Sequence, residues 1–105
     1  MRTTLLALLL LLAPAAASAQ GAFDGVWTGQ AGDWKIRLQV NGKRGHIVLT
    51  CTTVHRFDIP VGADGTINSW LSSQTFARRQ IAGRLPSLII PSTGRCRGGP
   101  TNLKR

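Results

Sequence analysis

The sequence predicts an all-β fold, a small antiparallel meander that is closed or nearly closed into a barrel. Apolar and polar residues alternate along several short segments, as expected for strands with one buried face. Asn-Gly and Asp-Gly dipeptides, which are typical of tight turns between antiparallel strands, separate these segments. The segments are about four to eight residues long, a normal length for strands. An open β-sandwich is the alternative arrangement of the same strands.

Residues 1–19 are expected to be a signal peptide rather than part of the folded domain. Arg2 supplies a positive start, an unbroken apolar run extends from Leu5 to Ala13, and residues 17–19 form an A-x-A cleavage pattern. The run has nine residues, whereas a helix that spans a bilayer needs roughly 20. We therefore expect an exported protein, periplasmic or secreted, with no transmembrane segment after cleavage and a single small β domain over residues 20–105.

The clearest strand begins at Trp34, where apolar residues alternate with charged and polar ones as far as Val40. This alternation places Trp34 on the buried face, and we expect Trp27 in the same interior. Pro60 cannot donate a hydrogen bond within a sheet, so it marks an edge or a strand end. Residues 74–76 form a short strand or a loop. The expected strands cover residues 34–40, 46–51, 56–61, 66–71, 79–85 and 87–90, and a last strand runs from Arg95 through Cys96 toward Leu103.

Cys51 and Cys96 are the only cysteines in the chain. Their even number and the expected export to an oxidising compartment favour one structural disulfide between them. A reactive thiol pair would usually be closer in sequence, as in Cys-x-x-Cys. The predicted bond ties an early hairpin to the end of the chain.

The start of the domain carries the motif Gly25-Val26-Trp27-Thr28-Gly29. It resembles the G-x-W motif that opens the first strand of lipocalin-type barrels. The resemblance implies structural roles for Gly25 and Trp27, with Trp27 closing one end of the barrel and Lys104 or Arg105 packing across its ring. An ordinary core Trp near the start of a sheet is the other interpretation. Over most of the domain the chain is also similar to small exported bacterial β proteins, a similarity that implies no particular activity.

Charge is distributed unequally along the chain. Residues 65–105 hold seven basic residues and no acid, whereas residues 20–64 hold five basic residues and all four Asp. The whole chain has a formal net charge of +9, and removal of Arg2 with the leader leaves +8. A half of the chain that carries only positive charges attracts anions, and the planar guanidinium group of Arg can form paired hydrogen bonds with a carboxylate or a phosphate. The candidate anion-binding residues, expected to share one face or rim, are Arg78, Arg79, Arg84, Arg95 and Arg97.

The sequence offers little material for catalysis or for binding a metal. It has no Glu, and the only conceivable catalytic set is His46, His55 and Asp58 with a Ser or Thr. His55 and Asp58 are three residues apart, so on a regular strand they point to opposite faces. The chain lacks G-x-S-x-G and H-E-x-x-H motifs and any known metal-ligand spacing. We therefore expect no enzyme activity, no metal site and no cofactor.

These features favour a non-enzymatic extracytoplasmic binding domain whose basic C-terminal half binds an anionic envelope component or an acidic protein. Nucleic acid is disfavoured as a partner because the protein is expected to be exported and has no series of stacking aromatics. The alternative is a periplasmic barrel-type inhibitor of a secreted protease that inserts its segment Gln20–Asp24 into the enzyme's cleft. Exported metalloprotease inhibitors resemble this chain, although their two Cys lie closer together. A high-pI exported protein without a binding role has the same composition.

Overall fold

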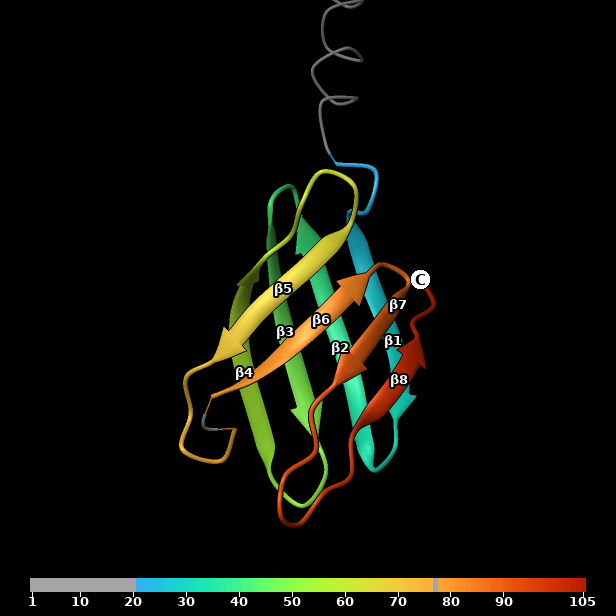
Figure 1. Ribbon diagram of the computed structural model, residues 1–105. Coiled ribbons are helices and arrows are strands. Elements are labelled where there is room, and N and C mark those ends of the chain that lie inside the picture. The colour runs from blue at the N-terminus through green and yellow to red at the C-terminus, as the bar shows by residue number, and fades with distance from the viewer. Residues whose placement is uncertain (1–20, 77) are drawn as a thin grey trace, which may run out of the picture.

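Figure 1 shows the computed structural model, which describes residues 21–76 and 78–105. The expected signal peptide, residues 1–19, lies outside the described residues, as does Gln20. The described chain contains eight strands and no helix, so it includes no helix that could span a bilayer. The strands are β1 (Gly25–Ala31), β2 (Trp34–Asn41), β3 (Arg44–Thr50), β4 (Val54–Pro60), β5 (Thr66–Leu71), β6 (Arg79–Arg84), β7 (Ser87–Ile90) and β8 (Gly99–Asn102).

The strands form two antiparallel four-stranded sheets, ordered β1-β2-β3-β4 and β5-β6-β7-β8. Within each sheet every strand pairs with its neighbour in sequence. Short turns make four of these six connections, and longer loops follow β5 and β7. At the turn between β2 and β3, for example, Asn41 lies opposite Arg44 and Gly42 adopts a φ of 64°. Figure 1 shows the second sheet lying across the first, with its strands oblique to those behind. The all-β prediction is confirmed.

The expected closure into a barrel is not observed among the described strands, and the alternative, an open sandwich, fits the structure. The chain leaves β4 after Pro60, which has no N–H to offer a neighbouring strand. The next N–H, that of Val61, donates to the carbonyl of Lys43 within the first sheet's own turn, at 2.8 Å. At the other side of the sandwich, β1 is joined to the segment that follows β8 by one isolated bridge between Thr28 and Lys104.

The alternation of apolar and polar residues places a continuous apolar layer between the sheets. Trp27 is 6% exposed and Trp34 is 1% exposed, so both indoles belong to this core. Each sheet also contributes fully buried aliphatic residues, which are Leu38, Ile47 and Leu49 in the first sheet and Ile67, Ile81, Leu88 and Ile90 in the second. Burial of one such side chain contributes about 1.5–3 kcal/mol. The core therefore holds the two sheets as a rigid support for the loops at their ends.

The predicted disulfide between Cys51 and Cys96 is present. Cys51 follows β3, whereas Cys96 lies in the loop of residues 91–98 and not in the last strand. That strand, β8, begins at Gly99, because the residues before it form a compact loop with its own hydrogen bonds. Residues 74–76 also lie in a loop. The disulfide therefore ties a loop of the second sheet to the end of a strand of the first.

Candidate binding site at one end of the sandwich

Four of the five candidate arginines lie at one end of the sandwich. Arg79 begins β6 and Arg78 precedes it, whereas Arg84 ends the same strand at the opposite end. Because β7 runs antiparallel to β6, the loop after β7, with Arg95 and Arg97, lies at the same end as Arg78 and Arg79. The structure therefore separates Arg84 from the other four, since β6 spans its whole sheet.

Arg84 has an acidic neighbour at its own end. Its guanidinium lies 3.4 Å from a carboxylate oxygen of Asp64. Hydrogen bonds from the side chain and then from the backbone of Thr66, together with the charge of Arg84, lower the pKa of Asp64. Among the described residues, Arg84 is the only Lys or Arg that forms an ion pair with a carboxylate.

The end that carries the other four arginines is here called the basic end. It consists of the Gly32–Asp33 turn, the loops of residues 51–53 and 91–98, and residues 72–76 and 78, with the strand residues next to them, and it lies at the bottom and lower left of Figure 1. Its exposed basic residues, counted to three positions from these turns and loops, are Lys35, Arg56, Arg78, Arg79, Arg95 and Arg97. Arg37 lies one position beyond this limit, level with Arg56 in the register of the first sheet. Its one acid among the described residues is Asp33, whose carboxylate accepts the backbone N–H of Arg97 at 2.7 Å. The basic end thus presents six cations with no carboxylate paired to them.

Sequence reasoning missed two of these six cations, Lys35 and Arg56, because the first half of the chain has a net charge near zero. In the folded protein the strands place the acidic residues of this half away from Lys35 and Arg56. Asp24 precedes β1, Asp58 is near the end of β4 and Asp64 precedes β5, so all three lie toward the opposite end. The alternation of apolar and polar residues already placed Lys35 on a solvent-facing side of its strand. The position of each charged residue along its strand, counted from the nearest turn, predicts the end of the sheet at which it lies, and this signal could have identified the six cations of the basic end.

The 91–98 loop is held in one conformation by a set of local hydrogen bonds. The Thr93 N–H donates to the Cys96 carbonyl at 2.8 Å, and the Cys96 N–H donates to the Thr93 hydroxyl at 3.1 Å. The Asp33 N–H donates to the Arg97 carbonyl at 2.8 Å, which binds the loop to the first sheet. A Cβ at Gly32, whose φ is +58°, would meet the Arg97 carbonyl oxygen at 2.3 Å. Only Gly permits this close approach without a shift of the backbone.

A cavity of about 350 Å³ opens at the basic end beside the disulfide. Four threonines line it, Thr52, Thr53, Thr75 and Thr93. His55 and Arg95 add nitrogen groups to the wall, and none of the described lining residues is acidic. The lining therefore offers hydroxyl, imidazole and guanidinium groups, which together suit a ligand rich in hydrogen-bond acceptors.

An aromatic cluster forms the inner side of this cavity. The ring of His55 lies edge-on to Trp34, with centroids 5.7 Å apart, and edge-on to Phe76, with centroids 5.1 Å apart. Thr53 Oγ1 lies 2.8 Å from His55 Nε2, which fixes the imidazole. The buried Nε1–H of Trp34 has no hydrogen-bond acceptor among the described residues. Buried donors without acceptors are uncommon in folded proteins, and Trp34 is also one of the residues that line the cavity.

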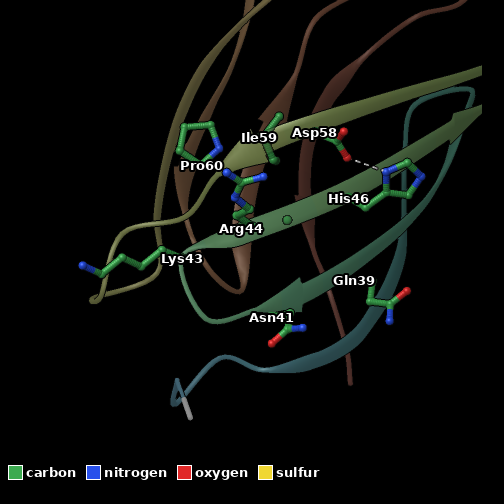
Figure 2. A pocket seen from close by; sticks show the side chains of 9 residues that line it. Gln39, Asn41, Lys43, Arg44, His46, Asp58, Ile59 and Pro60 are labelled. Atoms are coloured by element: carbon green, nitrogen blue, oxygen red, sulfur yellow. Dashed lines mark hydrogen bonds and ion pairs between the residues drawn. The ribbon is translucent and has the colours of Figure 1, made fainter. Parts of the chain in front are cut away.

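A second hollow, of about 550 Å³, lies on the outer face of the first sheet near the turn between β2 and β3. Figure 2 shows His46 directed toward Asp58 from the adjacent strand, with Arg44 and Lys43 nearer the turn. The His46 Nδ1 and Asp58 Oδ1 atoms are 2.8 Å apart, but the side chains are 45% and 87% exposed. Exposed pairs of this kind contribute about 0–1 kcal/mol. The hollow is open to water and is a weaker candidate than the cavity.

The three conceivable catalytic residues do not form one constellation. His46 lies opposite Asp58 on the exposed face, whereas His55 lies opposite Leu49 and contacts the core aromatics. Residues 21–76 and 78–105 contain no cluster of three or more His, Cys, Asp or Glu side chains that could hold a metal. Comparison of the chain with protein-family models, curated proteins and solved structures finds no match.

Proposed function

We propose that this protein is an exported, non-enzymatic binding domain that uses its basic end to bind an anionic component of the cell envelope. The observation that carries the proposal is the grouping of six exposed cations around one end, where the carboxylate of Asp33 is occupied by a backbone N–H. Like charges gathered at one end of the molecule repel one another, and an anionic partner relieves that repulsion. Arg side chains also match carboxylate and phosphate in geometry.

The support beneath these cations favours recognition by a preformed surface. The 91–98 loop is closed by its own hydrogen bonds and by the disulfide, so Arg95 and Arg97 project from an ordered backbone. Binding by a preformed surface loses less conformational entropy than binding by a mobile tail. Strands β2 and β4 hold Lys35 and Arg56 beside the loop in the same way.

The alternative function, protease inhibition through the Gln20–Asp24 segment, has less support. The described part of that segment is bound to the domain, because Arg105 Nη1 donates to the Ala22 carbonyl at 2.9 Å. Asp24 in turn accepts the N–H of Gly42 at 2.7 Å. A segment that enters an enzyme's cleft must project from its domain, whereas these contacts hold residues 22–24 against the sheets.

Charge reversal at either end of the sandwich tests the proposed function. The variant Arg78→Glu/Arg79→Glu alters the basic end, and Lys43→Glu/Arg44→Glu makes the same change in charge at the opposite end. We expect the protein to be retained on an anionic polysaccharide matrix and released by salt, with much weaker retention of the first variant than of the second. Equal retention of both variants would show that binding follows net charge and would overturn the assignment to the basic end.

A further inference from the structure

The cavity at the basic end differs from the charged surface around it because its groups converge from different parts of the chain. Thr52 comes from the loop after β3, Thr75 from the loop after β5, and Thr93 and Arg95 from the loop after β7. A surface that attracted anions only by its charge would not need such a hollow. The cavity of about 350 Å³ is near the lower limit of about 300 Å³ that is typical of small-ligand sites.

The backbone that carries the donors of this cavity is held in place before any ligand arrives. Arg95 lies between Thr93 and Cys96, which close the loop through two mutual hydrogen bonds. The disulfide then fixes Cys96 to the first sheet. Trp34, 1% exposed, lines the same cavity and keeps its Nε1–H without an acceptor among the described residues. The Thr53 hydroxyl is paired with His55 and the Thr93 hydroxyl with Cys96, so Arg95, Thr52 and Thr75 are the donors of the lining that remain for a ligand.

We propose that this cavity binds a single small oxyanion, a carboxylate or a phosphate group, carried by the anionic partner. Arg95 binds the charge through its guanidinium fork, the hydroxyls of Thr52 and Thr75 donate to the remaining oxygens, and the buried indole of Trp34 forms the inner wall beside the anion. The proposal rests on the proposed function and deepens it, because it names the chemical group recognised. The exposed cations draw a polyanion to the basic end, and the cavity selects one of its groups.

A titration followed by nuclear magnetic resonance tests the site directly. Sodium glucuronate, inorganic phosphate and uncharged methyl glucoside are added separately to the folded protein, and the indole N–H signals of the three Trp residues are followed. We expect the chemical shift of the Trp34 indole N–H to change to a saturating value as glucuronate or phosphate is added, and to remain unchanged with methyl glucoside. Saturation with only one of the two anions identifies the group. No saturable shift of Trp34 with either anion would overturn the proposal.

Arg95→Gln and Arg97→Gln form a matched pair of variants for this experiment. Both residues are exposed, both belong to the 91–98 loop and both changes remove one charge, but Arg95 lines the cavity and Arg97 lies outside its wall. We expect Arg95→Gln to weaken binding of the small anion about tenfold or more, and Arg97→Gln to leave it nearly unchanged. Thr75→Val, which removes only a hydroxyl, should also weaken it. Equal losses in the two Arg variants would assign the binding to general charge and overturn the cavity site.

The outcomes separate this proposal from the function on which it rests. If the anionic matrix retains the protein but no small anion saturates the Trp34 signal, the proposed function stands and the cavity site is wrong. If Arg95→Gln and Arg97→Gln both bind the matrix less well and only Arg95→Gln loses binding of the small anion, the results support the polyanion-binding function and the cavity site together. If the anionic matrix retains neither the parent protein nor any variant but the small anion still binds, the proposed binding of a polyanion is wrong and the cavity is a site for a small molecule.

Discussion

At the scale of single residues, the contact between Trp27 and Arg105 joins the two termini of the domain. The guanidinium carbon of Arg105 lies 4.5 Å from the centroid of the Trp27 ring, and the Trp27 Nε1–H donates to the Phe23 carbonyl at 2.9 Å. Gly25, next to this contact, has a φ of 132°, a backbone conformation that residues with side chains rarely adopt. The basic residue expected across the Trp27 ring is thus Arg105.

Truncation of Arg105 tests the importance of this contact for stability. We expect Arg105→Ala to lower the free energy of unfolding by about 1 kcal/mol, since it removes a cation–π contact and the hydrogen bond to Ala22. Lys104→Ala is the matched control, because its side chain is exposed and its pairing with Thr28 uses only the backbone. Urea unfolding measures both variants, and equal losses would show that the contact with Trp27 contributes nothing.

At the scale of elements, the 91–98 loop is the part of the fold that departs most from its sequence pattern. Residues from Arg95 onward were expected to form a strand, but the chain turns at Thr93 and is bound by Cys96 before β8 begins at Gly99. A Cβ at Gly98 would meet the Ile90 carbonyl oxygen at 2.1 Å. The loop is therefore packed against the end of its own sheet and depends on residues that tolerate close approach.

Removal of the disulfide should destabilise the whole domain. Cys51 and Cys96 are 45 positions apart, and in the chain-entropy model a loop of this length contributes roughly 4 kcal/mol. We expect Cys51→Ala/Cys96→Ala to lose a comparable amount in urea unfolding, a large share of the stability of so small a domain. A reductant should cause a similar loss in the parent protein and none in the variant. A parent protein whose stability does not change on full reduction would refute this account.

At the scale of the whole molecule, the fold converts a charge difference along the sequence into a charge difference between two ends. The basic end has six cations and one acid, whereas the other end has three acids, Asp24, Asp58 and Asp64, beside five cations, Lys43, Arg44, Arg84, Lys104 and Arg105. A polyanion is therefore expected to meet the molecule in one orientation, with the 91–98 loop toward it.

Mutual repulsion of these cations predicts how stability depends on salt. Sodium chloride shortens the range of charge interactions from about 30 Å at 0.01 M to about 8 Å at 0.15 M. Because the described domain carries many cations and few ion pairs, we expect its melting temperature to rise over this range. Arg78→Gln/Arg79→Gln should reduce the rise, and Lys43→Gln/Arg44→Gln should reduce it less. A melting temperature that falls with added salt would contradict net repulsion.

Local features of the sequence were enough to predict the all-β class, the buried faces of the strands and the disulfide. Alternation along Trp34 to Val40 reports directly which side of a strand is buried, because successive side chains point to opposite faces. Two cysteines in a chain leave one intramolecular pairing. Each of these conclusions depends on neighbouring residues or on a count, so no knowledge of distant contacts was needed.

The open sandwich, the basic end and the cavity were decided by tertiary structure alone. Closure of a barrel depends on pairing between β1 and β8, the two ends of the chain, and on the path from β4 to β5. Lys35 and Arg97 share one end only because strand order brings their turns together, and Asp33 reaches the Arg97 N–H across 64 positions of sequence. Such contacts follow from the packing of whole sheets, which no alternation, turn signal or local charge encodes.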